Sequence, residues 1–92
     1  MSSKRRTKIE IIYDILKSIQ NKGGQIKPTH LLYKSNLSHK KMMEYLDDLM
    51  KKEMIDEVTF NGNKMYTITN KGLQYLVEFK QIQKFSSAFG IN

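Results

Sequence analysis

Apolar residues recur every three to four positions in three stretches of this chain, which is the spacing of amphipathic helices. The spacing predicts helices over residues 7–21, 28–35 and 38–52. The glycine pair at 23–24 favours termination of the first helix. Pro28 suits the first turn of the second, because proline lacks the N–H that would be unpaired there. The predicted core positions of these helices are Ile9, Ile12, Leu16, Ile19, Leu31, Leu32, Met42, Leu46 and Leu49.

The second half of the chain predicts a β-hairpin and one more helix. Two alternating runs flank Asn61 and Gly62, and Asn-Gly between such runs is a strong hairpin signal. Thr69 is placed to cap a final helix. Two helices joined by a tight turn and followed by a hairpin describe a winged helix-turn-helix, an α+β and mostly helical fold of three helices and a wing. The predicted units are a flexible basic arm at 1–6, a winged-helix domain at 7–68, a C-terminal helix for dimerisation at 69–86 and a tail at 87–92.

The start of the third predicted helix has an unusual charge. Ser38 is in position to cap this helix, so Lys40 and Lys41 fall in its first turn, at the positive end of the helix dipole. Each exposed cation there costs about 0.3–1 kcal/mol. A capping box would have Glu or Gln at position 41, where this chain has lysine. Free N–H groups next to lysines predict a site for an anion.

The charge distribution makes nucleic-acid phosphate the expected anion. The 92 residues have a net charge of +7. Residues 1–41 hold ten Lys or Arg and two acidic residues, whereas residues 42–57 hold two basic and six acidic residues. Such segregation is typical of one face directed at a polyanion. The partner that we expect is therefore double-stranded DNA.

Several separated motifs resemble those of an archaeal winged-helix family of small basic DNA-binding proteins. They share their order and spacing with that family over roughly residues 6–78. The motifs are Arg6-Thr7-Lys8-Ile9-Glu10-Ile11-Ile12, Tyr33-Lys34-Ser35-Asn36-Leu37-Ser38, Tyr45-Leu46-Asp47-Asp48-Leu49 and Tyr66-Thr67-Ile68-Thr69-Asn70-Lys71-Gly72.

The resemblance implies a winged-helix fold, double-stranded DNA as ligand and dimers formed through the last helix. It also implies a transcription regulator or a chromatin-associated protein, without choosing between the two. The chain departs from the family at Glu53, where a glycine usually ends the third helix. Its last helix is also expected to be short, with residues 85–90 as its fraying end.

The candidate DNA contacts lie on four predicted segments. Each has a plainer interpretation: lysines on a solvated helix face, a serine that only caps, and arginines in a solvated tail. Acidic residues from Glu44 onward repel phosphate, so we expect contact by the third helix to end near Met43. The candidates are Arg5, Arg6, Lys34, Ser35, Ser38, His39, Lys40, Lys41 and Lys64.

The last helix has two apolar stripes. Leu73, Leu76 and Val77 form the first, which we expect to face the domain's own core. The second would be exposed in a monomer and predicts a homodimer interface. The alternative packs the second stripe against the broad face of the first helix. This second stripe consists of Tyr75, Phe79, Ile82 and Phe89.

Other classes of function have little support in the sequence. No cysteine is present, and His30 and His39 lie nine residues apart on different predicted helices, so no metal site is expected. No catalytic constellation, cofactor motif or small-molecule substrate site is evident, and we expect no enzyme. No run is long and apolar enough for a membrane span, so a cytoplasmic, nucleoid-associated protein is expected. The competing hypothesis is a protein–protein interaction module of the transcription machinery that uses the acidic surface at 44–57.

Overall fold

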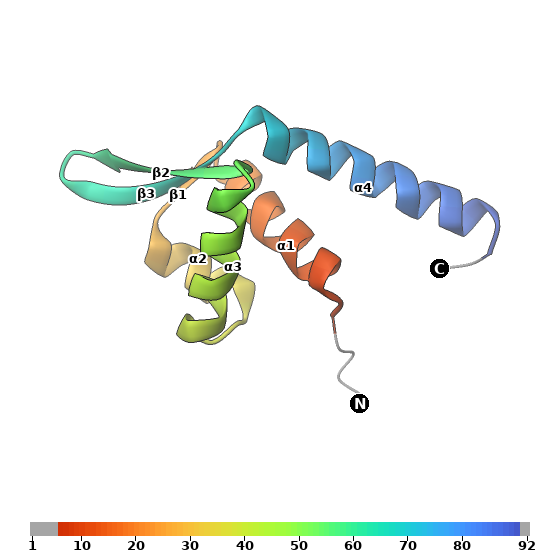
Figure 1. The fold of residues 1–92 in the computed structure, drawn as a ribbon, viewed down its shortest axis with the longest axis horizontal. Coiled ribbons are helices and arrows are strands. Elements are labelled where there is room, and N and C mark those ends of the chain that lie inside the picture. The colour runs from red at the N-terminus through yellow and green to blue at the C-terminus, as the bar shows by residue number, and fades with distance from the viewer. Residues whose placement is uncertain (1–5, 91–92) are drawn as a thin grey trace.

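The computed structural model describes residues 6–90 and contains four helices and a three-stranded sheet (Figure 1). Along the chain the order is α1, β1, α2, α3, β2, β3 and α4. The winged helix-turn-helix prediction is confirmed. The bounds are Lys8–Asn21 for α1, Gln25–Ile26 for β1, Pro28–Ser35 for α2, His39–Lys51 for α3, Ile55–Phe60 for β2, Asn63–Ile68 for β3 and Asn70–Ala88 for α4.

The sheet is antiparallel, in the order β1-β3-β2. Strands β2 and β3 form the wing, with Phe60 paired to Asn63 at the end of the ladder. Asn61 and Gly62 connect them at φ 52° and 77°. Two positive φ values are what a two-residue hairpin turn needs, because that turn matches the twist of the strands. The Asn-Gly signal therefore located the wing correctly.

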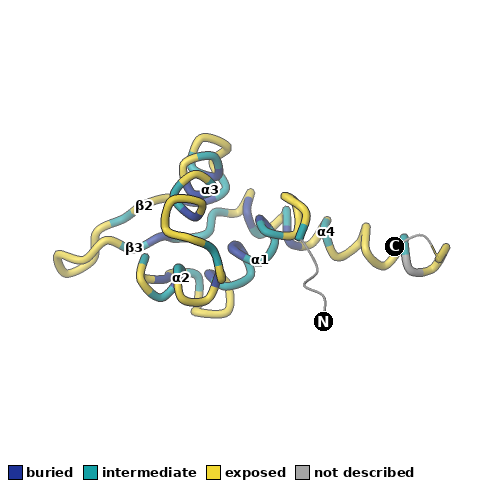
Figure 2. Tube along the Cα trace, turned by 90° about the horizontal axis from the view of Figure 1, so that it is seen from below, coloured by how far each residue is buried: buried dark blue, intermediate teal, exposed yellow. Residues whose placement is uncertain are grey.

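The core lies between α1, α2, α3 and the sheet, and only the first part of α4 reaches it. Figure 2 shows buried positions in the domain and mostly exposed ones along the end of α4. The predicted stripe of α3, Met42, Leu46 and Leu49, is fully buried. The buried hydrophobic residues are Ile12, Ile15, Leu16, Ile19, Ile26, Leu31, Met42, Leu46, Leu49, Ile55, Tyr66 and Leu76.

Two predicted core positions are exposed instead. Ile9 and Val77 each keep 57% of their surface accessible. They belong to α1 and α4, which pack against each other, and in these helices Ile12 and Leu76 are buried instead. Apolar spacing alone does not reveal the angle at which α4 crosses α1, and this angle decides which residues are covered.

The end of α3 explains how Glu53 replaces the expected glycine. Glu53 has φ 62°, in the left-handed region that favours glycine. Its N–H donates to the Met50 carbonyl, and the Met54 N–H donates to the Leu49 carbonyl. These bonds satisfy the last carbonyls of the helix. The chain therefore keeps the turn into β2 and accepts a strained residue there.

Helix α4 is longer than predicted. The Thr69 hydroxyl accepts a hydrogen bond from the Gly72 N–H at 3.1 Å, as expected of a cap. The helix continues to Ala88, past the predicted end at residue 86, and Gly90 follows with φ 66°. Beyond the domain it projects as a single rod (Figure 1).

Candidate nucleic-acid interface

The turn between α2 and α3 presents the start of α3 to solvent. Asn36 ends α2 in the left-handed region at φ 58°, and Ser38 precedes α3 with extended backbone. The Ser38 hydroxyl accepts the Lys41 N–H at 3.1 Å. The predicted cap is therefore present, without the reciprocal bond of a capping box.

The first turn of α3 is cationic and open to solvent. His39, Lys40 and Lys41 are all exposed. Lys41 approaches Glu44 at 3.7 Å, but both side chains are more than half exposed. A pair of this kind contributes about 0–1 kcal/mol, so a phosphate can compete with it. This turn can meet an anion with two ammonium groups and the unpaired N–H groups of the helix start.

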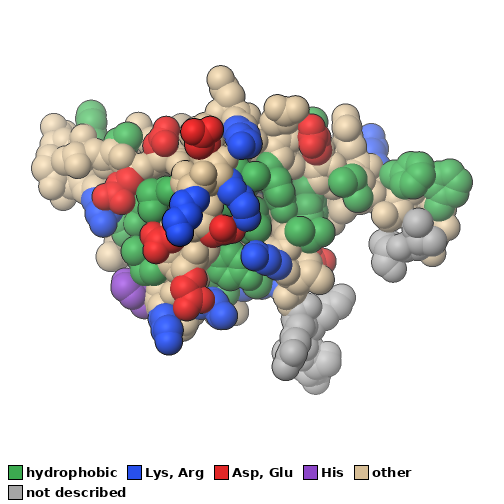
Figure 3. All heavy atoms as spheres, viewed as in Figure 1, with side chains coloured by type: hydrophobic (Ala, Val, Ile, Leu, Met, Phe, Trp, Pro, Cys, Tyr) green, Lys and Arg blue, Asp and Glu red, His purple; other side chains and the backbone are tan. Residues whose placement is uncertain are grey.

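The second half of α3 has the opposite charge. Glu44 and Asp47 are exposed, and Asp48 pairs with Lys52 at 2.8 Å. The hydrogen bond from Lys52 holds the pKa of Asp48 below its ordinary value, so this carboxylate is ionised at neutral pH. These acidic groups would repel a phosphate, whereas the start of the helix has the opposite charge. Figure 3 shows acidic and basic groups close together over this part of the molecule.

Two further lysines lie on neighbouring elements. Lys34 is exposed in the last turn of α2, and Lys64 is exposed on β3 near the wing tip. Lys64 lies 3.5 Å from Glu57 on β2, again as a partly exposed pair. Both lysines are exposed, and their contact with phosphate stays a prediction.

Ser35 does not fit its predicted role in phosphate contact. It is only 2% exposed, and its hydroxyl donates to the Leu32 carbonyl at 3.2 Å. The same hydroxyl accepts the Leu37 N–H at 3.3 Å. The side chain therefore organises the turn between the helices. The predicted phosphate contact is wrong for this side chain, because its hydroxyl is buried and bonded to the backbone of the turn.

Arg6 is held against the domain and is not part of a free arm. Its guanidinium donates to Asp14 at 2.8 Å and to the Ser35 carbonyl at 2.9 Å. It thereby links the start of the chain to α1 and to the end of α2. The predicted flexible arm does not extend to this residue, because two of its N–H donors are bound within the domain. The guanidinium keeps further donors and part of its surface accessible, so its DNA contact stays a prediction. Arg5 lies outside the described residues.

The second stripe of α4 is divided between two environments. Tyr75 donates its hydroxyl to the Ile9 carbonyl at 3.0 Å, and Phe79 stacks on Tyr13 of α1. These two follow the alternative in which the stripe packs on the same chain. Ile82 and Phe89 remain 65% and 67% exposed.

An apolar groove, which sequence reasoning missed, lies between the start of α1 and the second half of α4. Its apolar lining comes from Ile9, Val77, Phe79 and Ile82. Green surface gathers between these helices and at the far end of α4 in Figure 3. The signal available in the sequence was Ile9, an apolar residue in the first turn of α1, where burial by its own domain is least complete.

Within residues 6–90 no group of three or more His, Asp or Glu side chains is placed to hold a metal ion. No described helix has the length and apolar character needed to cross a membrane.

Comparison with known proteins agrees with this geometry. The sequence profile described as winged helix-turn-helix matches residues 5–87. The uncharacterized protein MJ0290 of Methanocaldococcus jannaschii is 33% identical over 82 residues, which are 89% of this chain and 36% of that protein. The chain thus spans about a third of the length of this relative.

Solved structures give the same result. Sso10a-2, a DNA-binding protein from Sulfolobus solfataricus, has a TM-score of 0.75 and 27% identity, over 91% of this chain and 85% of that one. F93 from STIV, a winged-helix DNA-binding protein, has a TM-score of 0.74 and 20% identity, over 87% and 92% of the two chains. The predicted resemblance to archaeal winged-helix proteins is confirmed.

Proposed function

Because the chain belongs to the winged helix-turn-helix family, we propose that it binds double-stranded DNA without catalysing a reaction. The observation that carries this proposal is the open, cationic first turn of α3, at Lys40 and Lys41. In a helix-turn-helix the second helix enters the major groove, and in this chain that would bring the first turn of α3 to the DNA. Lys34 and Lys64 flank it from α2 and the wing and would contact the backbone.

The proposed interface favours affinity over sequence specificity. Arginine paired to guanine is the commonest specific contact, and α3 contains no arginine. Lysine binds phosphate as a point charge with little directional preference. His39 and Ser38 are the groups left to approach base edges. A transcription regulator of modest specificity, or a chromatin-associated protein in the nucleoid, fits this set of side chains.

A homodimer through α4 is the second part of the proposal. The apolar groove between α1 and α4 continues along Ile82, and its rim has Glu10 on α1 with Lys80 and Lys84 on α4. A twofold-related copy can bury its own Ile82 there and bring opposite charges together. An interface that contains both signs of charge and an apolar centre is suited to such self-association.

Salt-dependent binding to a duplex tests the DNA proposal. With four to six phosphate contacts per protomer, log K should fall with log salt at a slope of about −4 to −5 per protomer. Measuring affinity for one duplex by fluorescence anisotropy at several salt concentrations gives this slope. A slope near zero, or no binding at low salt, would contradict the proposal. Salt-insensitive association with a protein partner would instead support the interaction-module hypothesis.

The mass in solution tests the dimer separately. Ile82→Lys places a charge on an exposed position of the groove without disturbing the domain's own contacts. We expect a dimer for the natural chain and a monomer for this variant, measured by light scattering. A monomeric natural chain would refute the dimer and leave the DNA proposal intact.

A further inference from the structure

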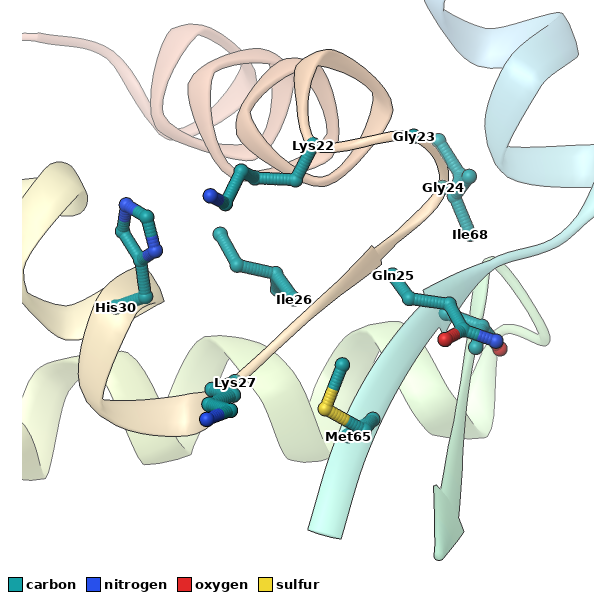
Figure 4. A pocket seen from close by; sticks show the side chains of 10 residues that line it. Lys22, Gly23, Gly24, Gln25, Ile26, Lys27, His30, Met65 and Ile68 are labelled. Atoms are coloured by element: carbon teal, nitrogen blue, oxygen red, sulfur yellow. The ribbon is translucent and has the colours of Figure 1, made fainter. Parts of the chain in front are cut away.

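A second basic site lies at the start of α2, whereas the turn into α3 follows the end of that helix. A depression of about 710 Å³ opens there, bordered by the end of α1, strand β1, the start of α2 and strand β3. Lys22, Lys27 and His30 line it, together with uncharged residues. In Figure 4 the side chains of Lys22 and His30 point toward one another across Ile26, and Lys27 extends from the end of β1. None of the residues that line it in the described structure is acidic.

We propose that this depression, which we call the Lys22–His30 pocket, binds a phosphate group. Lys22 at the end of α1, Lys27 before α2 and His30 on α2 concentrate positive charge in a concave, partly polar site. A phosphate between them would accept hydrogen bonds from Lys22, Lys27 and the imidazole N–H groups. Gln25 and Thr67 supply further polar groups at the edge.

The electrostatics of His30 would change when an anion binds. Partial burial, followed by the positive charges of Lys22 and Lys34, lowers the pKa of His30. Lys22 follows the end of α1, Lys27 precedes the start of α2 and Lys34 lies on α2, while β3 contributes the uncharged Met65 and Thr67. A bound phosphate would reverse this effect, because an anion favours the charged imidazolium. Binding should therefore take up a proton, and the affinity should rise as the pH falls through the titration of His30.

The phosphate could come from the duplex or from a free phosphorylated molecule. Thr67 and Met65 belong to the base of the wing, and Lys34 lies next to the turn. The pocket thus lies between two elements that the proposed function places on the DNA backbone. If the phosphate is that of the duplex, the inference rests on that function; if it is free, it does not.

Pyrophosphate provides a test that needs no DNA. We expect a saturable shift of the His30 ring signals in NMR spectra of the full chain, and a higher His30 pKa in pyrophosphate than in chloride of equal ionic strength. Lys22→Gln should weaken this response several-fold, and Lys51→Gln, an exposed lysine on α3, should leave it unchanged. No saturable shift, or an equal response in both variants, would overturn the inference.

The salt dependence of duplex binding then identifies the source. If the backbone occupies the pocket, Lys22→Gln should reduce the magnitude of the slope by about 1, and Lys51→Gln should not. A positive pyrophosphate response with an unchanged slope supports a free phosphorylated ligand. A positive response in a chain that binds no duplex would refute the proposed function alone.

Discussion

Tyr13 of α1 and Phe79 of α4 stack with ring centroids 4.5 Å apart and planes inclined by 24°. This contact and the hydrogen bond from Tyr75 to Ile9 fasten the first half of α4 to the domain. Past Phe79 the apolar side chains Ile82, Phe85 and Phe89 are exposed. Helix α4 therefore has one part that stabilises the monomer and another that is available to a second copy.

The two parts should respond differently to truncation. Phe79→Ala removes the stacking partner of Tyr13, and we expect a loss of about 2 kcal/mol, below the 3–5 kcal/mol of a fully buried Phe. Ile82→Ala should leave the stability of the monomer nearly unchanged and weaken the proposed dimer. Denaturant unfolding at low protein concentration, with light scattering at high concentration, separates the effects. Equal losses of monomer stability would show that Ile82 is packed within its own chain.

Local patterns predicted the fold well because each of its main signals is local. The stripe of Met42, Leu46 and Leu49 and the Asn61-Gly62 turn depend on residues close in sequence. The incorrect predictions involve contacts between residues that are far apart in the sequence. Arg6 is tied to Ser35 across 29 positions, and the exposure of Ile9 and Val77 depends on how α4 crosses α1.

In the candidate site, too, the features set by residues close in sequence were predicted and those set by the folded arrangement were not. Apolar spacing and capping placed the cationic turn of α3 at the surface, since both follow from the sequence of that helix. Burial of Ser35 was not predictable, because the local bonds of its hydroxyl depend on the conformation of the turn. The Lys22–His30 pocket was missed for a related reason: its shape depends on how the end of α1, the start of α2 and strand β3 pack together, which local patterns do not reveal.

Gly72 should be sensitive to the smallest substitution. A Cβ at this position would lie 2.5 Å from the Met54 carbonyl oxygen and 2.7 Å from Cγ1 of Ile68. The carbonyl also accepts the Thr69 N–H, so it cannot easily move. We expect Gly72→Ala to destabilise the protein by about 1–3 kcal/mol despite the better helix propensity of alanine.

Thermal unfolding by circular dichroism measures this change. Gln74→Ala, an exposed position in the same helix, is the matched control and should change stability by only a few tenths of a kcal/mol. A Gly72→Ala variant as stable as this control would mean that α4 shifts away from the end of α3 at little cost.

Glu53→Gly should stabilise the protein. The left-handed conformation costs a residue with a Cβ about 1–2 kcal/mol, and glycine avoids that cost. Greater freedom of glycine in the unfolded chain offsets about 0.5–1 kcal/mol, so a net gain of about 0.5–1 kcal/mol is expected. The hydrogen bond that the Thr69 hydroxyl donates to the backbone carbonyl of residue 53 is retained.

Glu53→Ala is the control for this substitution, measured by denaturant unfolding. Alanine also removes the carboxylate but keeps the Cβ, and should give no comparable gain. If both variants were stabilised equally, the destabilising effect of Glu53 would come from its charge and not from its φ of 62°.

Reversing the charge at the start of α3 separates binding from folding. In Lys40→Glu with Lys41→Glu, carboxylates replace cations at the positive end of the helix dipole, where each is favoured by about 0.3–1 kcal/mol. Both side chains are exposed, so no core contact is lost. Duplex binding should fall below detection, and the free energy of unfolding should stay equal or rise slightly.

The control makes the same change in net charge at the other end of the same helix. Lys51→Glu with Lys52→Glu removes the ion pair of Lys52 with Asp48 and places acidic groups at the negative end of the dipole. Its stability should therefore fall, while its affinity for DNA falls much less than that of the first variant. Anisotropy titrations and denaturant unfolding of both variants give the comparison. Equal losses of affinity would mean that net charge alone governs binding, and a loss of stability in the Lys40 and Lys41 variant would assign those lysines a structural role.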